Sequence, residues 1–223
     1  MSKARHRPHL LVPDCGSGKN PLPLDSAAVH HLEQVLRIDS TDVSYTDGIG
    51  LFGTGVYRDG LVERGEEARV ARPTGLAAAV APPHTKARVR FVVEKLAELG
   101  VRRLLWLRTA RTEGRPPRPD KARSWAVGAL EQSRGAWLME VDNGPISVDE
   151  VAEFGTPVFA VAGGSDPARI ILPSDPVLCV GPEGGFAAGE VPDSAQRVDL
   201  GPTVLRVETA AVAAVALLSA RAR

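Results

Sequence analysis

Two short segments near the C-terminal end combine glycine and proline with charged residues, and we expect the chemistry of the chain to lie there. Residues 180–186 read VGPEGGF, and residues 200–210 read LGPTVLRVETA. Glycine lets the main chain approach a ligand closely, and proline stiffens a loop. The first segment continues the strand-like apolar run 177–180, and the second leads into an alanine-rich helix. The pattern predicts a cleft, made of two strand-end loops, that holds a small polar ligand.

Other catalytic patterns are missing from the sequence. Residues 13–20 resemble a phosphate-binding loop, but Pro13 and Asn20 stand where GxxxxGK[ST] requires Gly and then Ser or Thr, so we interpret this segment as an exposed turn. No GxGxxG follows a strand, and the five histidines form no HExxH. The sequence therefore predicts neither nucleotide hydrolysis nor a metal site.

The composition is that of an ordinary globular chain. Of 223 residues, 43% are hydrophobic, and 27 basic residues balance 27 acidic ones. The zero net charge argues against a basic coat, although the cluster of cations between Arg108 and Arg123 could lie along RNA phosphates or form a solvated face. Cys15 and Cys179 form no CxxC pair, which favours a reducing cytoplasm, and we expect Cys179 to be an inert core thiol. No export signal or membrane anchor is apparent, so we expect a cytoplasmic protein.

The hydrophobic pattern predicts the elements that position the two segments. Short apolar runs broken by Gly, Asp and Pro predict a small β-rich domain over residues 1–72, with a boundary near Arg72 and Pro73. Strand and helix signals then alternate over residues 73–223, which predicts an α/β fold with a mostly parallel sheet and ligands at the C-terminal ends of its strands. The expected strands are 76–81, 104–107, 158–161 and 177–180, and the expected helices are 89–99, 120–132, one opening at Ser147 and 209–220.

Further motifs, together with the two glycine segments, resemble a known family. Residues 95–101 read KLAELGV, residues 131–133 read EQS, and residues 30–37 read HHLEQVLR. These motifs follow one another along the chain in the family's order, and they resemble those of the SPOUT-type RNA methyltransferases, and within them the enzymes that methylate N3 of a uridine in 16S ribosomal RNA. The resemblance covers nearly the whole chain.

This resemblance implies an architecture that the hydrophobic pattern alone does not. It implies a SPOUT-type, mostly parallel sheet with a C-terminal trefoil knot over residues 73–223, and a small PUA-like, RNA-binding β-barrel over residues 1–72. It also implies a homodimer with the active site at its interface. The implied cofactor is S-adenosylmethionine and the implied partner is ribosomal RNA or the 30S subunit, with neither a membrane nor a metal involved.

The resemblance also assigns the cofactor to a main-chain cradle. Gly181, Gly184 and Gly185 can bring peptide groups against adenosine without a Cβ in the way. The full set of expected cofactor contacts is Val180, Gly181, Pro182, Glu183, Gly184, Gly185, Leu200, Gly201, Val204 and Leu205.

The methyl acceptor sets a second requirement, because N3 of uridine is protonated at neutral pH and must lose its proton. Arg206 is the candidate catalytic residue that stabilises the developing negative charge or orients the base, and a structural salt bridge is the alternative role. Glu208 is the candidate proton acceptor, or else it caps nearby backbone amides. Residues two apart on a helix do not face each other, so we expect separate tasks for the two.

Six further residues are candidates for RNA contact, with ordinary exposed surface as the alternative. Lys86 and Arg88 could bind phosphate at the start of a helix. By resemblance, Gln132 lies near the RNA or a partner subunit, and Lys95 helps to order the active-site face. The set is Lys86, Arg88, Lys95, Arg111, Gln132 and Arg134.

The chain departs from the family pattern in the Arg- and Pro-rich segment 109–119, at residues 134–139 and at Val207. The departures gather where RNA would be read, so two interpretations stay open. One is a methyltransferase that uses S-adenosylmethionine to modify N3 of a 16S uridine, or of a different RNA. The other is a non-catalytic RNA-binding or ribosome-assembly protein that retains the fold.

Overall fold

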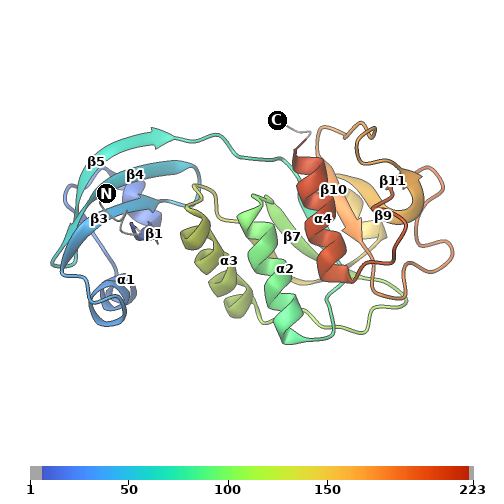
Figure 1. Ribbon diagram of the computed structural model, residues 1–223, viewed down its shortest axis with the longest axis horizontal. Coiled ribbons are helices and arrows are strands. Elements are labelled where there is room, and N and C mark those ends of the chain that lie inside the picture. The colour runs from blue at the N-terminus through green and yellow to red at the C-terminus, as the bar shows by residue number, and fades with distance from the viewer. Residues whose placement is uncertain (1–6, 221–223) are drawn as a thin grey trace. The chain divides into compact units, whose positions relative to one another are not determined.

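The computed structural model describes residues 7–220, and the chain forms two compact units (Figure 1). One unit holds the described residues up to Arg72 together with Leu130–Leu138, and the other holds Pro73–Ala129 and the residues from Met139 onward. None of the helices in this described part has the length and apolar character of a membrane span.

The first unit is built on a five-stranded sheet with the order β1-β3-β4-β5-β2. The strands are β1 (His9–Leu11), β2 (Leu22–Pro23), β3 (Ser40–Thr46), β4 (Leu51–Arg58) and β5 (Leu61–Arg69). β1 runs parallel to β3, and the other neighbours are antiparallel. A 3₁₀ turn (Pro13–Ser17) and α1 (Ser26–His30), which continues as a π-helical turn (His31–Val35), complete the unit. β1 and β2 are the two edges of this sheet and do not pair with each other, so the strand pairing does not confirm the expected PUA-like β-barrel.

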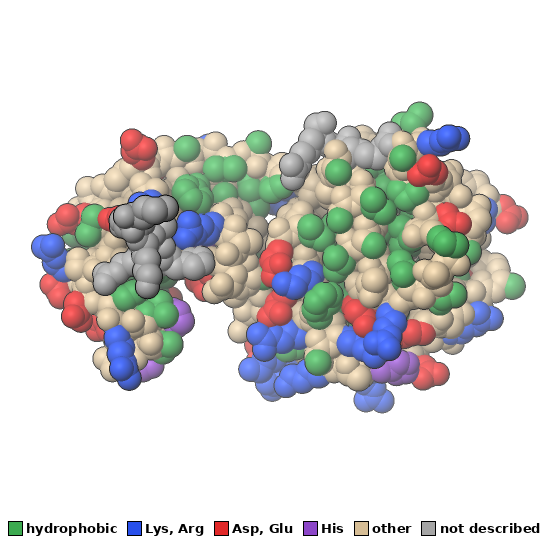
Figure 2. Space-filling model, in the orientation of Figure 1, with side chains coloured by type: hydrophobic (Ala, Val, Ile, Leu, Met, Phe, Trp, Pro, Cys, Tyr) green, Lys and Arg blue, Asp and Glu red, His purple; other side chains and the backbone are tan. Residues whose placement is uncertain are grey.

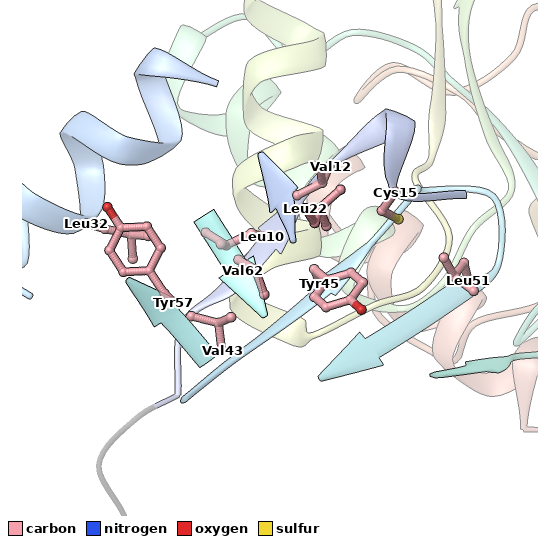
Figure 3. Close-up of a cluster of buried hydrophobic side chains, with 10 residues drawn as sticks. All are labelled: Leu10, Val12, Cys15, Leu22, Leu32, Val43, Tyr45, Leu51, Tyr57 and Val62. Carbon is pink, nitrogen blue, oxygen red and sulfur yellow. The ribbon is translucent and has the colours of Figure 1, made fainter. Parts of the chain in front are cut away.

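The first unit has its own hydrophobic core (Figure 3). Tyr45 and Tyr57 bury their rings completely, and the Tyr57 hydroxyl donates to Glu33 at 2.7 Å. The segment 130–138 is fastened to this unit by buried polar contacts. The His9 ring lies 3.0 Å from the Gly135 carbonyl through Nε2 and 2.8 Å from Ser44 Oγ through Nδ1. Burial lowers the pKa of His9, so the neutral ring is the favoured form.

The second unit contains a six-stranded sheet in which every pairing is parallel, with the order β11-β9-β10-β6-β7-β8. The strands are β6 (Ala77–Val80), β7 (Arg103–Arg108), β8 (Glu140–Ser147), β9 (Thr156–Ser165), β10 (Pro176–Val180) and β11 (Gln196–Val198). The helices are α2 (Lys86–Glu98), α3 (Pro119–Ser133), whose last turn belongs to the first unit, and α4 (Val207–Ser219). The mixed α/β fold with a parallel sheet confirms that part of the expected architecture.

Both faces of the parallel sheet are covered, as its short, wholly apolar central strands require. α2 and α4 lie side by side over one face, where α4 packs on β6 and β10 (Figure 1). Every second strand residue faces the opposite side, where a 3₁₀ turn (Asp149–Phe154) and residues 186–195 cover it. This second layer contains Ala77, Ala79, Leu105, Leu107, Phe159, Val177 and Cys179. Cys179 is fully buried, which confirms its expected place in the core, and burial raises the pKa of its thiol to about 12.

The predicted elements are confirmed except at Ser147. α2 begins after Thr85, whose Oγ1 accepts the Arg88 amide at 3.4 Å, and it is followed by Gly100 at φ +77°. Ser147 instead ends β8, and only a six-residue 3₁₀ turn follows. The local capping contact does form, because Glu150 accepts from both the amide and the hydroxyl of Ser147. That contact is satisfied without an α-helix, so the helix prediction was wrong.

Candidate cofactor and active site

The order of the parallel strands identifies the place where a ligand is expected. From β6 the chain moves through β7 and β8 in one direction, and β10, β9 and β11 lie on the other side of β6. The order therefore reverses between β6 and β10. In open α/β sheets, ligands bind outside the carboxyl ends of the strands at such a switch point. The first glycine segment leaves the carboxyl end of β10 at Val180.

A cavity of about 440 Å³ lies at this point, a volume typical of small-ligand sites. The middle of β9 supplies one wall through Ala160, Val161 and Ala162. The two glycine segments supply most of the rest of the lining. All the residues expected to contact the cofactor line this one cavity: Val180, Gly181, Pro182, Glu183, Gly184, Gly185, Leu200, Gly201, Val204 and Leu205.

The first glycine segment forms a tight turn that needs its glycines. The Gly185 amide donates to the Pro182 carbonyl at 2.8 Å. Gly185 has φ +69°, a backbone conformation that is unfavourable for residues other than glycine. A Cβ on Gly181 would come within 2.9 Å of the Phe186 ring. That ring packs edge-on against Phe159 at 5.4 Å and is held in the core. The main chain therefore passes closer to the core here than an alanine would allow.

Asp199 is a residue of this site that we did not identify from the sequence. One of its carboxylate oxygens accepts the Gly163 amide at 2.8 Å, and the other accepts the Gly201 amide at 2.9 Å. These two bonds join β9 to the second glycine segment and lower the pKa of Asp199. The spacing Asp-x-Gly at 199–201 is an Asx-turn signal that could have marked it.

The charged residues that line the cavity are of one sign. Among the residues that line it, Glu183 and Asp199 carry charge and both are acidic. The remaining lining is main chain, aliphatic side chains, Phe186 and Thr203. Such a lining favours a ligand with an apolar part and positive charge, and it opposes a phosphate group.

Arg206 and Glu208 lie at the start of α4, beside the cavity-lining residues Leu205 and Val207. Arg206 immediately precedes the helix and is exposed, and its guanidinium has no hydrogen bond or ion pair with any described residue. Glu208 is 9% exposed. Its Oε1 lies 3.3 Å from Arg88 Nε, while Oε2 is buried without a partner in the described chain. Neither the structural salt bridge considered for Arg206 nor the capping role considered for Glu208 is formed here.

Arg88 lies between two carboxylates of this site. Its side chain pairs with Glu208 and comes within 4.0 Å of Glu183 Oε1, which belongs to the cavity lining. This guanidinium therefore neutralises acidic groups of its own unit. Phosphate binding, the role that we expected, would have to compete with these contacts.

The other candidate RNA contacts have different surroundings. Lys86 is exposed in the first turn of α2, and Lys95 pairs with Glu98 at 2.7 Å. Arg111 donates to the carbonyl of Gly184 at 2.6 Å, so it contacts the cofactor segment directly. Gln132 and Arg134 are exposed and belong to the first unit. Figure 2 shows many Lys and Arg side chains along the lower edge of the second unit, interspersed with acidic ones.

The parallel sheet, the switch-point cavity and the glycine turns define an α/β protein with a cavity of small-ligand size that is lined largely by two loops. Residues 71–219 match the family model described as RNA methyltransferase domain, and the chain belongs to this family. A comparison with curated protein sequences gives no match.

Solved structures share the fold over nearly the whole chain. A probable rRNA methyltransferase from Porphyromonas gingivalis is similar with a TM-score of 0.81 and 24% identity, covering 97% of this chain and 100% of that one. A ribosomal RNA small subunit methyltransferase E from Neisseria gonorrhoeae, bound to S-adenosylmethionine, has a TM-score of 0.81 and 23% identity, with 97% and 98% covered. A putative methyltransferase from Legionella pneumophila, also holding this cofactor, has a TM-score of 0.79 and 24% identity, with 96% and 97% covered.

Proposed function

We propose that this protein is an RNA methyltransferase that uses S-adenosylmethionine, and that its substrate is N3 of a uridine in the 16S ribosomal RNA of the small subunit. The observation that carries the proposal is the convergence of two segments about twenty residues apart on one cavity at the switch point of the parallel sheet. Family membership supports the reaction class. The position on the RNA rests on the sequence motifs.

The lining of the cavity fits this cofactor. S-adenosylmethionine carries a sulfonium and an ammonium group, and the charged residues of the lining, Glu183 and Asp199, are both acidic. The adenosine part would meet the aliphatic wall of β9 and the peptide groups of Gly181 to Gly185. The bound cofactor supplies an activated methyl group, which leaves the protein the task of alignment.

The acceptor side of the reaction is assigned to Arg206. A guanidinium holds its charge without titrating near neutral pH, so it can stabilise the negative charge that develops on the uracil ring. The side chain makes no competing ion pair with the described residues, which leaves it available for a substrate. Glu208 is retained as the proton acceptor, since its unpartnered Oε2 is a free acceptor site.

The assembly belongs to the same proposal. We infer a homodimer, because Val204 on the cavity rim is 94% exposed and Leu217 on the outer face of α4 is 47% exposed, and a second copy would cover such apolar groups. A trefoil knot around the cofactor segments and a PUA-like, RNA-binding role for the first unit are proposed from the resemblance. The place of action is then the cytoplasm, where 30S subunits are available.

Calorimetric titration with S-adenosylmethionine tests the donor half of the proposal. We expect the wild-type protein and Arg206→Ala to bind alike, because Arg206 does not line the cavity. Gly184→Val should bind less well, since even a Cβ on Gly184 would lie 3.3 Å from Arg111 Cδ. A wild-type protein without measurable affinity would exclude the enzyme and favour an RNA-binding protein that retains the fold.

Methyl transfer to purified 30S subunits tests the acceptor half. Arg206→Ala should bind the cofactor and transfer no methyl group, and Arg206→Lys should transfer slowly because it keeps the charge without the planar fork. Mass spectrometry of the digested RNA then locates the methyl group. A product methylated elsewhere than N3 of uridine would refute the assignment of the acceptor while leaving the reaction class intact.

A further inference from the structure

Beside the cavity, two segments of the second unit are held together by hydrogen bonds from charged side chains on both segments. Arg111 Nη1 donates to the Gly184 carbonyl at 2.6 Å and to the Phe186 carbonyl at 3.4 Å. In the reverse direction, the Glu190 carboxylate accepts the Ala110 amide at 2.5 Å through Oε1 and the Ala187 amide at 2.6 Å through Oε2. In each of these bonds one partner is a charged side chain and the other is a main-chain group, so the bonds are stronger than neutral hydrogen bonds.

We propose that Arg111 and Glu190 are positioning residues that hold the cofactor segment 182–187 in its binding shape by clamping it to the turn at 109–112. This inference rests on the proposed function. It reassigns Arg111, which we expected to contact RNA, and it adds Glu190, which the motifs do not include.

The turn at 109–112 is a firm support for such a clamp. The Thr112 amide donates to the Thr109 carbonyl at 3.2 Å, and the Thr112 hydroxyl lies 3.0 Å from both the amide and the hydroxyl of Thr109. Thr109 is buried. Beyond the turn, Gly114 passes so close to the Pro82 carbonyl that a Cβ would overlap it. The turn is therefore fixed by its own bonds and by the segment that follows β6.

The clamped segment needs this support because its own bonds are few. Residues 181–188 form no strand or helix, and their internal main-chain bond is the turn between Pro182 and Gly185. The Gly184 carbonyl, which Arg111 holds, belongs to the peptide group that leads into Gly185 and its positive φ. Without Arg111 and Glu190, this peptide group could rotate, and the cradle would have to be reordered each time the cofactor binds.

Calorimetric titration with S-adenosylmethionine, without RNA, tests the clamp. Arg111→Met and Glu190→Ala should each weaken binding about 2- to 10-fold, the effect of losing one or two net hydrogen bonds. Glu190→Gln keeps one acceptor oxygen and Arg111→Lys keeps a charged donor, so both should recover part of the affinity. The control is Arg115→Met, which removes an exposed cation three residues beyond the turn that forms no hydrogen bond or ion pair with residues 182–190.

A double-mutant cycle and a comparison among the variants test the clamp further. In a double-mutant cycle, Arg111→Met and Glu190→Ala should be non-additive, because either change alone releases the same pair of segments. Affinities that match the wild type in all the variants, or that fall equally in Arg115→Met, would refute the positioning role. RNA binding that falls in Arg111→Met while cofactor affinity stays constant would instead restore the original assignment.

Amide exchange measured without any ligand separates this inference from the proposed function. We expect faster exchange over residues 182–190 in Glu190→Ala than in the wild type, with the same unfolding midpoint in urea. Unchanged exchange would refute the clamp whatever the cofactor does. A wild-type protein that binds no S-adenosylmethionine would refute the proposed function, and the exchange result would still decide the clamp.

Discussion

Replacement of Gly185 by alanine isolates the backbone conformation of the cofactor cradle from every steric effect. Gly185 has φ +69°, and a Cβ built on it would meet no atom within 4 Å. The side chain itself therefore has space, and the penalty comes from holding an L-residue in the left-handed region. That penalty is about 1–2 kcal/mol. It appears in the binding constant to the extent that the free segment relaxes to a negative φ and must be forced back when the cofactor binds.

The expected magnitude follows directly. Since 1.4 kcal/mol corresponds to a tenfold change in a binding constant, Gly185→Ala should weaken S-adenosylmethionine about 5- to 30-fold if the free segment relaxes fully. If the segment stays clamped, the same strain should instead lower the free energy of unfolding. Calorimetric titration and urea unfolding of the same variant measure both quantities. We expect the loss of binding free energy and the loss of unfolding free energy to add up to about 1–2 kcal/mol.

Two variants control this experiment. Gly185→Asn should recover much of the loss, because asparagine tolerates the left-handed region better than alanine. Gly18→Ala imposes the same strain at φ +76° in open space within the first unit, so it should lower stability without changing cofactor affinity. Gly185→Ala with both the affinity and the stability of the wild type would refute the argument that the cradle depends on this conformation.

Other predictions concern charges. Burial lowers the pKa of His9, so the neutral ring stabilises the first unit above pH 6.5. This contribution is lost as the pH falls from 6.5 through the lower pKa of the folded protein. His9→Gln should flatten the pH dependence of the free energy of unfolding in urea below pH 6.5. Arg88→Met should lower the free energy of unfolding by about 1–3 kcal/mol, because Glu208 then stays buried without a partner. The double variant Arg88→Met with Glu208→Gln should recover part of this loss. An Arg88→Met variant as stable as the wild type in urea unfolding would contradict the prediction. Asp199→Ala should weaken cofactor binding in calorimetry more than Asp199→Asn, and equal effects would count against its role as a double acceptor.

The local sequence determined the elements that carry the site. Hydrophobic spacing marked β6, β7, β9, β10, α2, α3 and α4, and Gly100 marked the region where α2 stops. Glycine and proline marked the two cofactor segments, because unusual backbone conformations require particular residue types at the position itself. These features depend on neighbours a few residues away, so they can be predicted without knowing the fold.

Pairing across long distances was decided only by the tertiary structure. The clamp joins residues about eighty positions apart, and Arg88 reaches Glu208 across more than a hundred. The residues next to Arg111 and Arg88 in the sequence do not distinguish a cation that pairs within the fold from one that is exposed on the surface. The 3₁₀ turn after Ser147 was decided in the same way, since the capping contact alone fits either outcome.

One physical cause explains why local elements could be predicted and the partners of charged side chains could not. Backbone preferences and capping bonds are satisfied within a single turn, so most of the central strands, the three long helices and the positions of the glycine loops could be read from the sequence. The partner of a charged side chain depends on which segments the parallel strand order brings to the same edge of the sheet. The partners of Arg88, Arg111, Glu190 and Asp199 are therefore set by the folded chain.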